Sequence, residues 1–127
     1  MKTIINTKNA PEPIGPYSHA VQAGGLIFVS GQIPLDHITG KLIVDDITAA
    51  TKLSLDNVKA ILAEAGADFS HIVKTSIFLK DMNDFAQVNE VYGTCFTADF
   101  PARETVQVAA LPKGVQVEIS VIAVKPW

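Results

Sequence analysis

The chain has 127 residues, a formal net charge of −3, 48% hydrophobic residues and 18% charged residues. This length fits one domain, residues 1–127, and the composition argues against a disordered chain. The acidic balance argues against nucleic acid or an acidic membrane as a partner, because both attract basic proteins. We expect a cytoplasmic protein, since no apolar run resembles a signal peptide or a membrane span and one cysteine forms no internal disulfide.

The N-terminal part of the chain predicts three short strands. Thr3–Asn6 has the β-branched residues typical of a strand, whereas residues 10–16 contain three prolines and one glycine and predict an irregular loop. Ala20–Ala23 and Leu26–Ser30 are apolar runs on either side of Gly24-Gly25. This arrangement indicates a tight hairpin.

The middle of the chain predicts a loop, a helix, a strand and a second helix. Gly31–Lys41 contains turn-forming residues, and from Asp46 apolar residues recur at helical spacing up to Gly66, a residue type that commonly ends helices. His71–Leu79 has the mixed pattern of a strand buried on much of both faces. Asp81–Asp84 offers N-caps for the second helix. The apolar stripe of that helix consists of Phe85, Val88, Val91 or Tyr92, Cys95 and Phe96, and Pro101 ends the segment.

The last quarter of the chain alternates apolar and polar residues in two stretches. Val106 and Val108 alternate with polar residues, and Val115–Val121 does so again after a turn at Leu111–Gly114. This pattern predicts a hairpin with one apolar and one polar face. The complete order is strand, two strands, helix, strand, helix, two strands, which predicts an α+β sheet with the helices on one face.

Two charged residues fall on the predicted polar face of this hairpin. In an extended strand Arg103 lies on the same side as Thr105 and Gln107, because alternate residues share a face. Glu118 lies on the polar side of the partner strand. Both are therefore expected on the side of the sheet away from the helices, a few rows apart. Such a face is either an ordinary solvated surface or an interface between subunits, in which the pair would form a partly desolvated carboxylate site.

Arg103 is the single arginine beside nine lysines. Its planar fork binds a carboxylate or phosphate through two parallel hydrogen bonds, which lysine does not offer. The residue is either a surface arginine present by chance or the one place in the chain where that fork is needed.

Other kinds of chemistry find little support in the sequence. His19, His37 and His71 lack metal-ligand spacing, so we expect no metal site. Cys95 falls on an apolar helical stripe, which favours a place in the core over a role as a nucleophile. Gly24-Gly25 is typical of a turn, and no phosphate-binding loop follows a strand.

Five motifs are distributed over essentially the whole chain. The most specific runs from Phe100-Pro101-Ala102-Arg103 to Leu111–Ile119, and the others are Ile14–Ser18, Phe28–Pro34, Asn83-Asp84-Phe85 and Asn89–Tyr92. Together they resemble the RidA (YjgF-like) family of reactive-intermediate deaminases.

This resemblance implies a chorismate-mutase-like α+β fold with a mixed sheet, a homotrimer with three clefts between subunits, and no cofactor. It also implies hydrolysis of 2-imino acids or their enamines, such as 2-iminobutanoate and 2-iminopropanoate, to 2-oxo acids and ammonia. The implied catalytic residues are Arg103, which would hold the substrate carboxylate, and Glu118, which would activate water. The residues implied to bind substrate are Tyr17, Ser30, Gly31, Asn89 and Thr105.

Two departures from the family pattern bear on the cleft. The family often has serine and then cysteine after the arginine, where this chain has Glu104 and Thr105, and the segment between Tyr92 and Pro101 is shorter than in many members. Glu104 has the opposite parity to Arg103 and is expected to point elsewhere. Two other functions stay open: a chaperone-like protein that binds small carboxylates without turnover, and an RNA-directed endonuclease. The acidic charge and the single arginine argue against the second.

Overall fold

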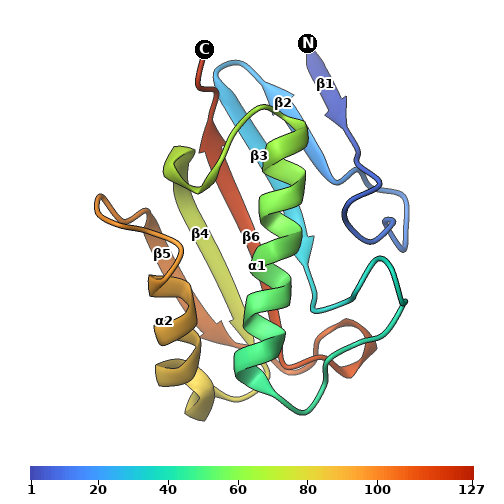
Figure 1. Cartoon of the computed structure of the whole chain (residues 1–127), viewed down its shortest axis with the longest axis vertical. Helices are drawn as coiled ribbons and strands as arrows, with labels where there is room; N and C mark the ends of the chain where they lie inside the picture. Colours follow the sequence, from blue (N-terminus) through green and yellow to red (C-terminus); the bar gives the residue numbers. More distant parts are fainter.

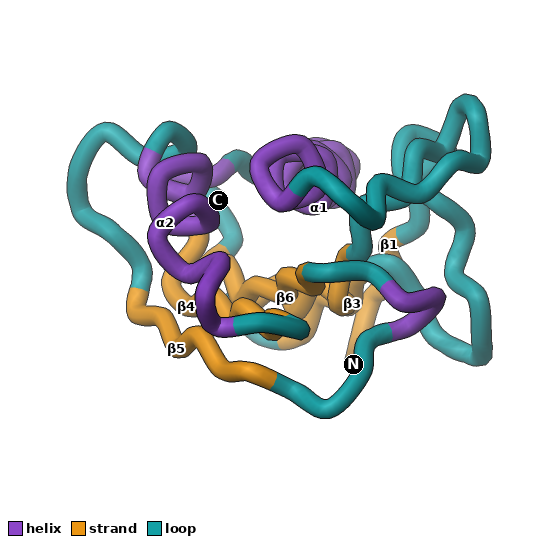
Figure 2. The backbone as a smooth tube through the Cα atoms, turned by 90° about the horizontal axis from the view of Figure 1, so that it is seen from below, coloured by secondary structure: helices purple, strands orange, loops and turns teal.

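A computed structural model describes residues 1–127 and shows one six-stranded sheet with two helices (Figure 1). The strands lie in the order β1-β2-β3-β6-β4-β5, and both helices lie on the same side of the sheet (Figure 2). The α+β class with the helices on one face is therefore confirmed. Neither helix has the length and apolar character needed to cross a membrane. The elements are β1 (Lys2–Ile5), β2 (Ala20–Ala23), β3 (Leu26–Gln32), α1 (Ile47–Glu64), β4 (Ile72–Leu79), α2 (Phe85–Gly93), β5 (Ala102–Gln107) and β6 (Val117–Val124).

Strands β2 and β3 form the predicted antiparallel hairpin, and β1 pairs with β2, also in antiparallel fashion. Gly24, in the turn between β2 and β3, has a φ of +59°, a left-handed conformation that favours glycine. The pairing of β3 with β6 shifts its register between Val29 and Gln32. This bulge contains Ser30 and Gly31, two of the residues expected to bind substrate.

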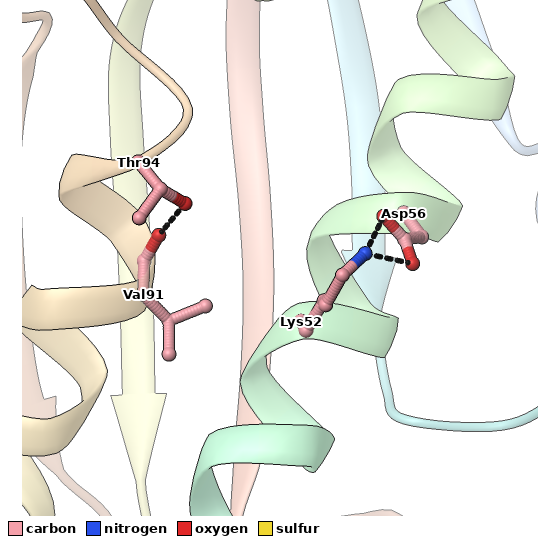
Figure 3. A network of polar contacts seen from close by, with 4 residues as sticks. All are labelled: Lys52, Asp56, Val91 and Thr94. Atoms are coloured by element: carbon pink, nitrogen blue, oxygen red, sulfur yellow. Dashed lines mark hydrogen bonds and ion pairs between the residues drawn. The ribbon is translucent and has the colours of Figure 1, made fainter.

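Helix α1 begins and ends where the sequence predicts. The Asp46 carboxylate accepts a hydrogen bond from the Ala49 amide and so caps the N-terminus. Gly66 lies just beyond the C-terminus with a φ of +78°, the conformation that commonly ends helices. On the exposed surface of α1, Lys52 and Asp56 form an ion pair with 3.0 Å between Nζ and Oδ2 (Figure 3).

Helix α2 is shorter than the sequence predicts. It follows a 3₁₀ turn over Met82–Asp84, and beyond its last turn the Thr94 hydroxyl donates a hydrogen bond to the Val91 carbonyl oxygen (Figure 3). Cys95 and Phe96 therefore lie outside the helix. Both are partly buried and pack against the core, in line with the structural interpretation of Cys95.

The hairpin predicted for the last quarter of the chain is wrong. β5 lies at the edge of the sheet and pairs in parallel with β4, whereas β6 lies in the centre between β3 and β4. The cause is α2, which crosses over the sheet and returns the chain so that β5 runs in the same direction as β4. An alternating pattern determines the two faces of a strand but does not identify its neighbours.

The core lies between the sheet and the helices. Alternate residues of β6, from Val117 to Ala123, are buried on this helix face. The opposite side of the sheet, called the open face below, is covered by no helix (Figure 2). In β4, Ser76 and Phe78 are only partly buried there, so the predicted burial on both faces is not seen in the single chain. Exposed apolar residues of the open face include Ile4, Leu26, Phe28, Val106 and Val124.

Candidate active site

Arg103 lies on the helix face, and its predicted place on the opposite face is wrong. In β5 it is level with Thr75 of β4, a fully buried residue of the helix face. Side chains of register partners point to the same side of a sheet. Because β5 is an edge strand covered only by the short α2, an arginine here faces the helix and still keeps its long side chain partly exposed.

Two aromatic rings and an asparagine of α2 surround the Arg103 guanidinium. Its Cζ lies 5.0 Å from the centroid of the Tyr92 ring and 5.6 Å from that of Phe85, distances typical of cation–π contacts. An Arg103 terminal nitrogen also donates a hydrogen bond of 2.6 Å to Asn89 Oδ1. A guanidinium has five N–H donors, so this hydrogen bond leaves donors for a ligand carboxylate.

Glu118 lies on the open face, as predicted, between the buried neighbours Val117 and Ile119. Its side chain is partly buried, and burial raises the pKa of its carboxyl group. A carboxylate with a raised pKa is a stronger proton acceptor than an ordinary one. Gly31 packs directly against it, because a Cβ added to Gly31 would lie 2.8 Å from Glu118 Cδ and would collide with Oε2. Only glycine at this position leaves the carboxylate where it is.

Tyr17 and Ser30 lie close to this glycine. Tyr17 is exposed in the loop before β2, and with Gly31 it lines a cavity of about 20 Å³, enough for one water molecule. The Ser30 hydroxyl donates a hydrogen bond of 2.6 Å to the Ser18 carbonyl oxygen and so joins β3 to this loop. Buried His19 holds the same loop through contacts of both ring nitrogens.

Glu104 and Thr105, which stand where the family often has serine and cysteine, point to opposite faces of the sheet. Thr105 faces α2, as Arg103 does, and its hydroxyl oxygen is buried without a hydrogen-bond partner. Glu104 lies on the open face, where hydrogen bonds from Ser76 and Lys74 lower the pKa of its carboxyl group. Glu104 therefore does not pair with Arg103, as its parity predicts.

The residues expected at the site form two separate groups. The arginine group is on the helix face at the edge of the sheet, and the glutamate group is around the bulge of β3 and the centre of the sheet. Each group contains one of the two expected catalytic residues, and the sheet lies between them. The arginine group consists of Asn89, Arg103 and Thr105, and the glutamate group consists of Tyr17, Ser30, Gly31 and Glu118.

The sequence pattern does not reveal the contribution of α2 to the arginine group. It assigns Phe85 and Tyr92 to an apolar core stripe, yet both rings contact Arg103, and Phe85 is 38% exposed. A signal was present in the spacing, because Phe85, Asn89 and Tyr92 are four and three residues apart and lie on one face of a helix.

The structure supports neither a metal site nor a nucleophilic cysteine. No group of three or more His, Cys, Asp or Glu side chains is placed to hold a metal ion. Cys95 is partly buried, and burial raises the pKa of its thiol, which disfavours the reactive thiolate.

The chain is similar to known proteins over nearly its whole length. The profile of the family described as Endoribonuclease L-PSP matches residues 7–125. A 2-iminobutanoate/2-iminopropanoate deaminase of Salmonella typhimurium is 50% identical, and the match covers 98% of this chain and 99% of that protein. A 2-iminobutanoate/2-iminopropanoate deaminase of Mus musculus is 48% identical, and the match covers 98% of this chain and 93% of that protein. The crystal structure of E. coli TdcF with bound serine has a TM-score of 0.92 at 47% identity, covering 96% of this chain and 98% of that one.

Proposed function

The chain belongs to the Endoribonuclease L-PSP (RidA/YjgF) family, and from this we propose that it is a hydrolase of carbon–nitrogen bonds that deaminates 2-imino acids. The substrates are small imino acids such as 2-iminobutanoate and 2-iminopropanoate, and the products are 2-oxo acids and ammonia. The deaminase names of relatives that are 48% and 50% identical support this reaction. The structural observation that carries it is the single arginine, whose guanidinium is held by α2 with donors left for a carboxylate.

The complete site forms between subunits of a homotrimer. Arg103 and Glu118 lie on opposite faces of one sheet, so a small ligand held by one does not reach the other in the same chain. A neighbouring subunit supplies the missing group when its glutamate group packs against the arginine group. The exposed apolar side chains of the open face support such packing, because covering them is favourable.

In this cleft Arg103 binds the substrate carboxylate through two N–H groups and so fixes the position of the imine carbon. Glu118 of the neighbouring subunit accepts a proton from a water molecule, whose oxygen bonds to that carbon while the C=N electron pair moves to nitrogen. The carboxyl passes the proton to the nitrogen and gives a carbinolamine. The Glu118 carboxylate then transfers the hydroxyl proton of the carbinolamine to its amino group. The C–N bond breaks, ammonia leaves and the carbonyl of the 2-oxo acid forms.

The other members of the two groups shape this cleft. Tyr17 stands at the edge of the glutamate group and shields it from bulk water, whereas Gly31 leaves space for the Glu118 carboxylate. Thr105 lies on the same face as Arg103, and its unpartnered hydroxyl is a further hydrogen-bonding group for the ligand if a small shift of the side chain exposes it.

The direct test follows the decay of 2-iminobutanoate and 2-iminopropanoate, generated in situ, with and without the protein. We expect the wild-type chain to accelerate the decay of both above the rate in water. A protein that binds 2-oxobutanoate but leaves both decay rates unchanged is a carboxylate binder, and this result would overturn the proposal. A parallel incubation with RNA tests the endonuclease alternative, for which we expect no cleavage.

A further inference from the structure

Three side chains of α2 form one stripe directed at Arg103. Phe85, Asn89 and Tyr92 are separated by four and three residues, so they lie on successive turns of one helix face. They give the guanidinium two ring faces and one hydrogen-bond acceptor. We propose that this stripe, the guanidinium cradle, consists of positioning residues that orient Arg103 for bidentate binding of the substrate carboxylate. This inference rests on the function proposed above.

Tyr92 connects the cradle to the sheet. Its hydroxyl donates a hydrogen bond of 2.9 Å to Thr75 Oγ1, and both residues are buried. Thr75 is also the register partner of Arg103 in the neighbouring strand. Contacts therefore run in a closed ring from β5 to α2, from α2 to β4, and back to β5. A ring of this kind fixes the distance between helix and edge strand, and so it restricts the rotamers of Arg103.

The exposure of Phe85 argues against a role in packing alone. Its side chain is 38% exposed at the edge of the sheet, so burial in the core does not explain its place. The ring lies instead against the guanidinium, at the boundary where a ligand would approach. An aromatic ring at such a site attracts a cation and restricts its movement without competing for its N–H donors.

All three cradle side chains are uncharged, and this leaves the charge of Arg103 available to an anion. The Asn89 amide oxygen holds one N–H group, as a carboxylate would, but it does not neutralise the guanidinium. The resemblance to the family implies that Asn89 binds substrate. The hydrogen bond to Arg103 assigns it a different role, in which it acts on the substrate through the arginine.

The orientation of Arg103 is measured directly by NMR, because the chain contains a single arginine and its Nε–Hε group gives one signal. In the wild type we expect a side-chain order parameter of about 0.8 and a Hε shift displaced by the two rings. Phe85→Leu and Asn89→Ala should lower the order parameter to below about 0.6. Phe69→Leu is the matched control, since that ring contacts Phe96 and not the guanidinium. A mobile Arg103 in the wild type would overturn the inference.

Ligand affinity distinguishes two possible effects of Asn89 on Arg103, namely its effect on the orientation of the guanidinium and its effect on the charge. Calorimetry with 2-oxobutanoate should give binding about tenfold weaker in Phe85→Leu and Asn89→Ala, with the melting temperature of each close to that of Phe69→Leu. The KM for imine should rise by a similar factor while kcat changes little, because the carboxylate is bound in substrate and transition state alike. Asn89→Asp should keep Arg103 rigid yet bind 2-oxobutanoate at least tenfold more weakly, since its charge competes with the ligand.

Unchanged affinity in Phe85→Leu and Asn89→Ala would contradict the cradle. Unchanged affinity in Asn89→Asp would show that Asn89 does not act through the charge of Arg103. The failure of the proposed function looks different, because then the wild type would not accelerate imine decay while the order parameters and the 2-oxobutanoate affinities still responded to the cradle variants.

Discussion

Arg103 and Glu118 lie on opposite faces of the same sheet, three residue rows apart. Arg103 is level with Thr75 of β4, and Glu118 is level with Phe78 of that strand. Because side chains alternate between faces, an odd number of rows places the two on opposite sides. One residue faces α2 and the other faces the uncovered side, and the proposed function therefore treats them as two half-sites that a second copy of the chain completes.

This arrangement predicts complementation between two inactive variants. Arg103→Ala lacks the carboxylate anchor, and Glu118→Ala lacks the base, so each homotrimer should be inactive. When equal amounts are unfolded together and reassembled, one site in four combines an intact arginine from one subunit with an intact glutamate from its neighbour. Imine hydrolysis should then recover to roughly a quarter of the wild-type rate, as expected for random mixing around a closed ring.

The control for this experiment is the same mixture without the unfolding step, which should stay inactive for as long as subunits do not exchange. Light scattering on each sample establishes that a trimer is present. If the reassembled mixture has no activity although hybrid trimers form, both residues act within one chain and the half-site interpretation fails.

Gly31→Ala should inactivate the enzyme without a large loss of stability. The new methyl group would occupy the place of the Glu118 carboxylate and push this flexible side chain away from its position. Gly25→Ala is the matched control, because a Cβ there meets nothing within 4 Å. We expect the imine assay to separate the two variants by about 10²-fold in kcat/KM, the scale of a misplaced general base. Equal rates would mean that the position of Glu118 is unimportant.

Arg103→Lys should lose most of the activity although it keeps the positive charge. A lysine ammonium binds a carboxylate through one point of contact, and it lacks the planar guanidinium that lies over the rings of Phe85 and Tyr92. We expect a loss in kcat/KM on the order of 2–3 kcal/mol, or about 30- to 150-fold. Steady-state kinetics on the folded protein measure it, and a wild-type rate would place the carboxylate anchor elsewhere.

Local sequence signals predicted most of the elements correctly. The Gly24-Gly25 turn, the start of the helical pattern at Asp46 and the glycine at position 66 each depend on a few adjacent residues, and the structure has all three. The end of α2 was harder to predict, because Cys95 and Phe96 continue its apolar pattern while packing on the core from a turn.

The sequence did not predict the neighbours of β5 and β6, and the error about Arg103 follows from this. Strand pairing depends on the crossover through α2, which no alternation of residues encodes. In a hairpin the apolar side of β5 would face the helices, but as the edge strand it turns Val106 outward and Arg103 toward α2. Glu118 was placed correctly, because in the central strand β6 the buried and exposed faces follow the apolar pattern.

The raised pKa of Glu118 links activity to stability, and Glu118→Gln tests both. Burial disfavours the ionised carboxyl, so the folded protein holds this proton more tightly than the unfolded chain does. Between the ordinary and the raised pKa the folded state therefore binds more protons, and the stability contribution of Glu118 falls as pH rises through this range. Wherever Glu118 is ionised, the wild type carries a partly buried charge that the glutamine variant lacks.

We therefore expect Glu118→Gln to melt at a higher temperature than the wild type at pH 7, and the difference to disappear under acid conditions where Glu118 is protonated. Its rate of imine hydrolysis should be at least about 10²-fold lower at pH 7, because an amide does not accept the proton of water. The wild-type rate, corrected for decay in water, should fall as pH decreases through the raised pKa, whereas the variant should lack this transition.

Binding of 2-oxobutanoate should persist in the variant, since Arg103 supplies the carboxylate contacts. A variant that is less stable at pH 7 would show that the charge of Glu118 has a stabilising partner, and a variant with the wild-type rate would remove it as the base. The two measurements together distinguish a carboxylate retained for catalysis, at a cost in stability, from one that serves the structure.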